Sequence, residues 1–323
     1  MTNDLILFND WHAVAKGEDL KPATLLPVRL LGQNIILWRY KNQLMAWQDQ
    51  CPHRGVSLAM GKISGDTLIC PYHGFQYDTT GACIHIPAYP NRLPPSRLSV
   101  KTYAVQEYYG LIWVCLGIPN TPKPAPFAEW QDSSYRKFLC GPYKYQSSGF
   151  RAIENFLDVS HFPFVHDGLL GSRNYTAVED YEVRKEETGF SLVNVPVWQP
   201  DPDGTGKGGK VIYNYRVWRP LTVSFVKVTN GNCLAIYFTV TPTNEDECLG
   251  WMWIAMNYGF EISEADLRAF QDKVVCQDIP IVESQQPKCL PLDLQAEFHL
   301  PFDKGSIFYR RWLREVGVSF GVI

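Results

Sequence analysis

The chain has 323 residues, of which 46% are apolar and 20% are charged, and its formal net charge is −3. This composition is typical of a globular protein, and the length is sufficient for two domains. The small negative charge provides no basic field for nucleic acid, and the sequence has no run of about 18 apolar residues that would predict a membrane span. We therefore expect neither nucleic acid nor a membrane as a partner.

The cysteines bear on the cellular compartment. There are nine of them, an odd number, and they are scattered along the chain. Residues 1–4 include an acid and no basic flank, so they do not predict a signal peptide. A long chain of this kind is expected to keep its thiols reduced rather than to form a disulfide framework, so we expect a cytoplasmic location.

The first third of the chain has the pattern of short strands joined by turns. Residues 34–40 and 44–47 are apolar and β-prone, and they flank a turn at 41–43. Residues 75–77 and 83–86 flank a second turn, Asp78-Thr79-Thr80-Gly81. Both patterns predict β-hairpins.

A proline-rich segment follows these strands. Four prolines occur within residues 117–126, which excludes a helix or a central strand there. We therefore predict a domain boundary, with a first domain at residues 1–120 and a second at 121–323.

The second domain mixes helices and strands. Residues 154–161 have helical composition, and residues 200–209 form a loop rich in Pro, Gly and Asp. Residues 234–240 and 249–256 predict a hairpin with a charged tip, and 261–284 predict the longest helix, with Ser263 near its start. The expected fold class is α+β, with a small all-β domain followed by a larger α+β domain.

Two short segments of the first domain each combine a cysteine, a histidine and a glycine. They are Cys51-Pro52-His53-Arg54-Gly55 and Cys70-Pro71-Tyr72-His73-Gly74, with sixteen residues between His53 and Cys70. The prolines stiffen the loops, and the glycines permit the backbone angles that tight loops need. Two such loops can present four ligands to one point.

Two metal centres are compatible with these ligands. A Rieske 2Fe–2S cluster is held by two cysteines on one iron and two histidines on the other. The alternative is a structural zinc site, which usually groups its cysteines and its histidines separately. Because each loop here mixes one cysteine with one histidine, we favour the cluster.

A second group of ligands lies within residues 154–166. Asn155, Asp158 and His161 recur every three residues, so on a helix they would share one face. His166 follows five residues after His161, and Pro163 between them should end or distort the helix and so bring His166 back. Two histidines and one carboxylate form the facial triad of non-haem Fe(II) oxygenases. The alternative is a polar helix end facing water.

At these residues the sequence resembles the Rieske oxygenases, the oxygenase (alpha) components of bacterial ring-hydroxylating and demethylating systems. The resemblance extends from Asp10-Trp11 to residues 309–312. It implies an N-terminal all-β Rieske domain and a C-terminal α+β catalytic domain, whose antiparallel sheet is flanked by helices. It also implies that Cys51, His53, Cys70 and His73 hold the cluster and that His161 and His166 bind a mononuclear iron.

The resemblance implies further roles for four residues. The third iron ligand would be an aspartate on a late helix, which points to Asp278. Glu283 is the alternative ligand, and in the other interpretation Asp278 is an ordinary surface aspartate. Asp158 would connect His161 to His73 of a neighbouring subunit, which requires a head-to-tail homotrimer. Asn155 would lie near the iron without being a firm ligand.

The function implied by the resemblance is that of a terminal oxygenase component. Electrons from NAD(P)H would pass through a separate reductase, and through a ferredoxin in some systems, to the cluster, and the iron would use O2 to hydroxylate a small organic substrate. The single-chain form looks most like the monooxygenases and demethylases of the family. Oxidative O- or N-demethylation and aromatic ring hydroxylation are the alternatives, and a non-catalytic Rieske electron carrier and a zinc-stabilised binding protein are alternatives of other classes.

One further resemblance concerns the substrate. Cyanobacterial Rieske hydroxylases of saxitoxin biosynthesis share the segments at residues 51–56, 158–164 and 309–313. This similarity favours an alkaloid-like, saxitoxin-type substrate, but the glycine-rich loop at residues 200–210 departs from those hydroxylases.

Overall fold

A computed structural model describes residues 4–323 of the protein, and they form two compact units. The N-terminal unit is Leu5–Pro124, and the C-terminal unit comprises Ala125–Ile323 together with Asp4. We predicted the boundary between residues 120 and 121. The chain passes from the first unit to the second after Pro124, inside the proline-rich segment. Among the described residues, no helix is long and apolar enough to cross a bilayer.

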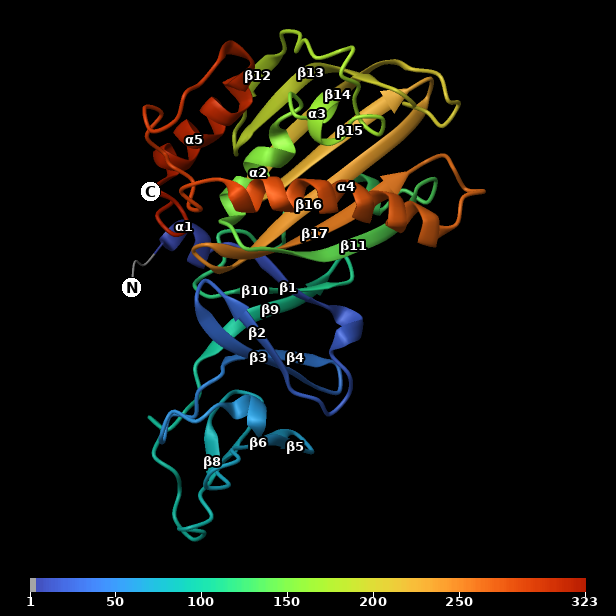
Figure 1. The fold of residues 1–323 in the computed structure, drawn as a ribbon. Helices are drawn as coiled ribbons and strands as arrows, with labels where there is room; N and C mark the ends of the chain where they lie inside the picture. The colour runs from blue at the N-terminus through green and yellow to red at the C-terminus, as the bar shows by residue number, and fades with distance from the viewer. Residues whose placement is uncertain (1–3) are drawn as a thin grey trace. The chain divides into compact units, whose positions relative to one another are not determined.

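The N-terminal unit is built from two antiparallel sheets (Figure 1). Six strands pair in the order β1-β10-β9-β4-β3-β2, and four short strands pair in the order β5-β6-β7-β8. The two predicted hairpins are confirmed as β3–β4 and β7–β8. The elements of this unit are α1 (Leu5–Phe8), β1 (His12–Lys16), β2 (Leu26–Leu30), β3 (Gln33–Tyr40), β4 (Gln43–Gln48), β5 (Lys62–Ser64), β6 (Thr67–Ile69), β7 (Gln76–Tyr77), β8 (Cys83–His85), β9 (Thr102–Tyr108) and β10 (Leu111–Cys115), with short 3-10 turns at Gly17–Asp19 and Leu58–Met60.

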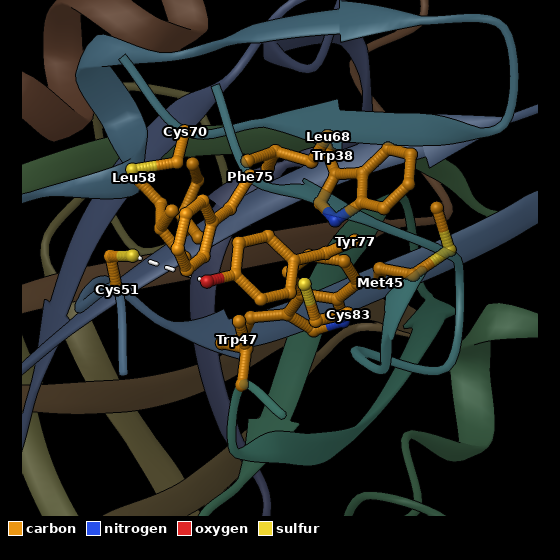
Figure 2. Packing of buried hydrophobic residues seen from close by; sticks show 12 residues of the cluster. Trp38, Met45, Trp47, Cys51, Leu58, Leu68, Cys70, Phe75, Tyr77 and Cys83 are labelled. Atoms are coloured by element: carbon orange, nitrogen blue, oxygen red, sulfur yellow. Dashed lines mark hydrogen bonds between the residues drawn. The ribbon is translucent and has the colours of Figure 1, made fainter. Parts of the chain in front are cut away.

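A buried aromatic cluster supports the smaller sheet (Figure 2). Trp38 and Trp47 meet edge to face with ring centroids 4.9 Å apart, and Tyr77 packs with them. Burial of each large apolar side chain contributes roughly 1.5–3 kcal/mol. Cys51 and Cys70 belong to the same buried cluster, so the two cysteine-bearing loops rest on a rigid base.

The C-terminal unit contains one antiparallel sheet of seven strands, in the order β11-β17-β16-β15-β14-β13-β12. The predicted hairpin with a charged tip is confirmed as β16–β17, in which Asn244 pairs with Glu247. The strands are β11 (Arg136–Tyr145), β12 (Glu182–Lys185), β13 (Phe190–Gln199), β14 (Gly209–Arg219), β15 (Thr222–Thr229), β16 (Asn232–Asn244) and β17 (Glu247–Met256).

Helices cover one face of this sheet. Figure 1 shows α2 (Gly149–Leu157) and α4 (Glu264–Ser284) on the same side, where α4 packs on β11 and α2 packs on β16 and β17. A short helix, α3 (Phe162–Val165), follows α2, and α5 (Lys304–Val316) contacts β12. Two 3-10 turns lie at Ala128–Trp130 and Pro301–Asp303. The predicted α+β fold class is confirmed.

One predicted helix ends earlier than we expected. α2 stops at Leu157, and Asp158 has extended backbone angles, with φ −84° and ψ 129°. The Asp158 carboxylate accepts a hydrogen bond from the Ser160 N–H at 2.8 Å, an alternative to helix that short acidic side chains often supply. The predicted common helical face of Asn155, Asp158 and His161 is therefore wrong.

The predicted effect of Pro163 is also wrong. Pro163 lies in the first turn of α3, where a proline has no N–H to lose and is well tolerated. His161 and His166 are the two residues that bound this short helix. The regular short helix α3 between them therefore brings the two histidines together, and Pro163 does not distort it.

The long helix is confirmed with a later start. Ser263 is its N-cap and accepts a hydrogen bond from the Asp266 N–H at 3.1 Å. The helix continues through Pro280 to Ser284. Several of its apolar side chains, including Val274 and Val275, line a cavity.

Candidate metal centres

The two Cys/His loops of the N-terminal unit have the same backbone construction. In each loop the cysteine N–H donates to the carbonyl of the residue after the glycine, at 2.8 Å, and the glycine N–H donates back to the cysteine carbonyl. Gly55 and Gly74 have φ angles of +73° and +70°, a region that other residues rarely adopt. The glycines after the histidines are therefore required by the turn itself.

The four candidate ligands differ in burial. Cys51 and Cys70 are each only 2% exposed, whereas His53 and His73 lie at the surface of the unit with ring centroids 4.7 Å apart. Burial raises the pKa of the Cys70 thiol, so a thiolate at this position needs a metal cation to compensate its charge. Two buried thiols and two exposed imidazoles fit a Rieske cluster with a thiolate-bound iron inside and an imidazole-bound iron outside.

Tyr77 is a member of this site that sequence reasoning missed. Its hydroxyl lies 3.2 Å from Cys51 Sγ (Figure 2). Burial, followed by the contact with Cys51, raises the pKa of Tyr77 well above its usual value, so the phenol stays protonated and can donate to the sulfur. In the sequence, Tyr77 is marked only as an apolar residue two positions after Phe75 in a strand. Such an alternating apolar pattern does not indicate a contact with a cysteine sulfur.

A second group of ligands converges in the C-terminal unit. His161 Nε2 and His166 Nε2 are 3.3 Å apart, and Asp278 Oδ1 lies 3.4 Å and 3.0 Å from them, respectively. Three ligand atoms held about 2.1 Å from one ion and at right angles would lie about 3.0 Å from one another. The spacing therefore fits the 2-His-1-carboxylate arrangement of non-haem Fe(II) sites.

The surroundings of Asp278 support the same interpretation. Its Oδ1 atom is buried, and among residues 4–323 no donor meets it with hydrogen-bond geometry. Burial alone would raise the pKa of Asp278, but the two adjacent imidazoles lower it to about 2. A buried, ionised and unsatisfied carboxylate oxygen next to two imidazoles is a metal-binding arrangement.

Both imidazoles are oriented from behind. His161 Nδ1 lies 3.0 Å from Asp158 Oδ2, and His166 Nδ1 lies 2.8 Å from Gln277 Oε1. With a proton on each Nδ1, both Nε2 lone pairs are directed toward the centre of the site. Burial lowers the pKa of His161, but Asp158 and Asp278 outweigh it and raise that pKa to about 9.

The remaining predicted residues occupy different places. Asn155 lines the cavity beside the histidines. Glu283 is not among the clustered ligands of the described residues, and its Oε1 accepts a hydrogen bond from the Gln146 N–H at 2.6 Å. Gln277, which orients His166, was not predicted, since no sequence pattern distinguishes it from a surface glutamine.

The triad opens into a cavity of about 460 Å³, a size that suits a small organic ligand. Most of its lining side chains are aromatic or aliphatic and come from the sheet and from α4. Three buried polar side chains outside the triad also line it, namely Gln199, Lys227 and Gln271. The aromatic lining residues are Phe138, Tyr145, Phe156, Phe162, Tyr213, Tyr215, Phe225, Phe238, Tyr258 and Phe270.

Comparisons with known proteins agree with both centres. The family model of the Rieske [2Fe-2S] domain matches residues 10–105, and that of the vanillate O-demethylase oxygenase C-terminal domain matches residues 149–318. The chain is 32% identical over 315 residues to methylxanthine N1-demethylase NdmA of Pseudomonas putida, covering 95% of this chain and 88% of that protein.

A further relative and a solved structure of NdmA show the same similarity. A vanillate O-demethylase oxygenase subunit of Pseudomonas sp. (strain HR199) is 26% identical, with 94% of this chain and 92% of that protein covered. The structure of P. putida NdmA with caffeine has a TM-score of 0.84 at 29% identity and covers 96% of this chain and 91% of that chain. These relatives are named for methylxanthines and vanillate, so the saxitoxin-type substrate expected from the sequence is not supported.

Proposed function

Because this chain belongs to the Rieske non-haem iron oxygenases, as an oxygenase (alpha) component, we propose that it oxidatively removes a methyl group from a nitrogen or oxygen atom of a small ring compound. It is an oxidoreductase that uses O2, a 2Fe–2S cluster and a non-haem iron, with electrons from a separate reductase. The non-catalytic carrier and the zinc-binding protein considered above are set aside, since the relatives are oxygenase components. The observation that carries the proposal is the His161–His166–Asp278 triad at the wall of a cavity with aromatic sides.

We assign the cluster to Cys51, His53, Cys70 and His73, and the iron to His161, His166 and Asp278. The donor types and the burial of the cysteines support the first assignment, and the short distances between ligand atoms support the second. Asp158 and Gln277 hold the two imidazoles in the required tautomer, and the apolar cavity excludes water from the reacting atoms.

The iron, when bound, supplies O2 activation with two electrons that reach it through the cluster. One oxygen atom is inserted into a C–H bond of the methyl group, and the other leaves as water after taking up two protons. The resulting carbinol breaks its carbon–heteroatom bond, so that formaldehyde leaves and the ring nitrogen or oxygen keeps a hydrogen. The chain's own contribution is to hold the methyl group beside the triad.

We further propose a head-to-tail homotrimer in which His73 of one subunit delivers electrons through Asp158 to His161 of the next. The exposure of His73 and the contact between Asp158 and His161 support this route. A ferredoxin between reductase and oxygenase stays a prediction. We also propose a cytoplasmic location, because none of the nine cysteines, all of which lie within residues 4–323, forms a disulfide and the reductase draws on NAD(P)H.

The test of demethylation uses the purified full-length protein with an NAD(P)H-dependent reductase, and caffeine, vanillate and related N-methyl and O-methyl ring compounds as probes. We expect one formaldehyde for each O2 consumed. His161→Ala should abolish formaldehyde production and leave the visible spectrum of the cluster unchanged, whereas the control Glu283→Gln should retain activity. A hydroxylated product that keeps its methyl group would contradict demethylation, and a reducible cluster without any O2-dependent product would contradict an oxygenase.

The test of the trimer uses hybrid oligomers. A variant without a cluster, Cys70→Ala, and a variant without the iron site, His161→Ala, are each expected to be inactive. If electrons cross between subunits, co-assembly of the two should restore activity in the mixed trimers. Inactive hybrids of confirmed mixed composition would contradict the proposed route.

A further inference from the structure

A lysine is buried in the wall of the cavity that contains the triad. Lys227 lies on β15, is 8% exposed, and lines the cavity together with Gln199 and Tyr213. Its Nζ atom donates to Gln199 Oε1 and to the Pro202 carbonyl, each at 3.0 Å. Gln199 in turn donates from Nε2 to the Tyr213 hydroxyl at 2.9 Å.

The ammonium group of Lys227 has no anionic partner in contact. Within residues 4–323, no carboxylate oxygen comes within 4.0 Å of its Nζ atom, although Asp201 and Asp203 lie near enough to raise its pKa. Burial has the larger effect and lowers the pKa of Lys227 to about 8, so the group still carries its charge at neutral pH. A lysine is rarely buried without a counter-ion, because the loss of hydration is costly.

Two of the three N–H bonds of the ammonium group are used by neutral acceptors. The third is left for a ligand in the cavity that Lys227 lines. The side chains around it are aromatic, with the rings of Tyr213 and Phe225 only 4.9 Å apart. A ligand there would meet aromatic walls and the Lys227 ammonium group, and the Asp201 carboxylate lines the same cavity without contacting that ammonium.

We propose that Lys227 is a specificity-determining residue that binds an anionic oxygen of the substrate, and that the substrate is a methylated aromatic monoanion such as a carboxylate. This inference rests on the proposed demethylase function. The cavity of about 460 Å³ is lined by both Lys227 and the triad, so a single small ligand can have its anionic end at the lysine and its methyl group at the iron site. The aromatic walls hold the ring between them.

A purely structural role for Lys227 is the competing interpretation. Its bond to the Pro202 carbonyl fixes the start of the loop between β13 and β14, and loss of that bond would disturb the loop without any ligand being involved. The two roles differ in one respect. A structural anchor affects charged and neutral ligands equally, whereas an anion-binding residue affects only the charged ones.

The experiment measures equilibrium binding to the full-length protein with its cluster, with matched pairs of methoxybenzoates and methoxybenzamides as probes. The wild-type protein should bind at least one acid about 10-fold or more tightly than its own amide. Lys227→Met should weaken the binding of that acid by about 10- to 100-fold and leave the affinity for the amide unchanged. Lys227→Arg should keep most of the preference, and Lys207→Met, which removes an exposed lysine from the adjacent loop, should behave as wild type.

Two results of the binding experiment would overturn the inference. One is a panel in which no acid binds more tightly than its amide, including a panel in which none binds. The other is a Lys227→Met protein that loses affinity for the acid and for the amide equally, as displacement of the loop would cause. Binding is measured without turnover, so the two proposals can fail separately. Formaldehyde production from neutral substrates alone would overturn only this inference. An acid-selective site in a protein that makes no formaldehyde would overturn only the proposed demethylation.

Discussion

His166 Nδ1 lies 2.8 Å from the side-chain oxygen of Gln277, the residue that immediately precedes Asp278 in α4. One turn of one helix therefore supplies a carboxylate to the candidate iron site and an orienting acceptor to one of its histidines. The other histidine is oriented by a carboxylate, Asp158, instead of an amide. The two imidazoles thus have different supports, and the loss of one should affect the metal in a different way from the loss of the other.

Gln277→Leu should weaken binding of a divalent metal at the triad by about 10- to 100-fold, the usual cost of removing a hydrogen bond behind a histidine ligand. Without the acceptor, His166 is free to carry its proton on Nε2, which blocks that nitrogen as a ligand. The measurement is competition of the purified protein with a chelator for Fe(II). Gln277→Glu, which keeps an acceptor oxygen, should retain most of the affinity.

The control for this variant is Lys273→Gln, an exposed change in the same helix. Gln277→Leu should also leave the visible spectrum of the cluster unaltered, because the cluster ligands lie in the other unit. Metal affinity equal to that of wild type in Gln277→Leu would mean that the Nδ1 contact does not orient the ring.

Tyr77→Phe should lower the reduction potential of the cluster. The Tyr77 hydroxyl donates to Cys51 Sγ at 3.2 Å, and a donor to a ligand sulfur stabilises the reduced, more negative state. If the bond favours the reduced state by about 1.4 kcal/mol, its loss lowers the potential by about 60 mV for a one-electron couple. The measurement is a redox titration followed by visible spectroscopy, with Tyr72→Phe, an exposed tyrosine of the second loop, as the control. A potential within about 10 mV of wild type would exclude this role.

The elements that sequence reasoning predicted well are those fixed by neighbouring residues. The hairpins β3–β4 and β16–β17, the proline-rich segment and the two Cys/His loops all depend on short-range patterns of turn residues and ligand spacing. The predicted helix at 154–161 ends early, at Leu157, because the side chain of Asp158 competes with the helical backbone through Ser160, and helical composition does not reveal that competition.

The parts that escaped prediction depend on contacts between distant segments. Gln277 meets His166 across 111 positions, and Lys227 meets Gln199 across 28. A glutamine on a helix and a lysine on a strand are most often at the surface, so neither residue type signals a buried site. Only the packing of α4 and β15 around the cavity gives these side chains a role.

Asp158→Ala should slow the transfer of electrons between the two metals even in protein loaded with iron, although loss of the acceptor behind His161 should also weaken iron binding. The carboxylate has one oxygen on His161 and the other on the Ser160 N–H, and its side chain is partly exposed, so it can also reach a second partner. The measurement is single-turnover oxidation of the reduced cluster by O2, with cluster and iron content determined on the same sample. Asp158→Asn, which keeps the acceptor for His161 but removes the charge, separates orientation from electron transfer. A wild-type rate of cluster oxidation in Asp158→Ala would exclude the proposed route.

A buried ion-pair network links α2 to α5. Arg310 on α5 donates to both oxygens of Glu154 on α2, at 2.6 Å and 2.8 Å, and Glu297 accepts from both Arg310 and Arg151. Arg151 and Arg310 are each 2% exposed. Because two buried guanidinium groups share two carboxylates, removal of one carboxylate leaves positive charge without compensation.

Glu297→Gln should therefore destabilise the protein at pH 7 by about 1–3 kcal/mol, a discounted value because the Glu297 side chain is 29% exposed. Burial raises the pKa of Glu297, but the hydrogen bonds from Arg151 and Arg310 outweigh it and the pKa is lowered in the folded protein. A carboxyl group with a lowered pKa stabilises the fold above its unfolded-state pKa of about 4.3. That stabilisation is lost as the pH falls through the lower pKa of the folded state.

The stability difference between wild type and Glu297→Gln should therefore be constant from pH 7 to about pH 5 and should shrink below about pH 4.3. The measurement is urea unfolding of both proteins across this range. Glu315→Gln is the matched control, since Glu315 lies on α5 itself and forms an exposed pair with Lys185 that contributes about 0.5 kcal/mol or less. A difference that stays the same down to pH 3 would mean that Glu297 acts through its shape and hydrogen bonds and not through its charge.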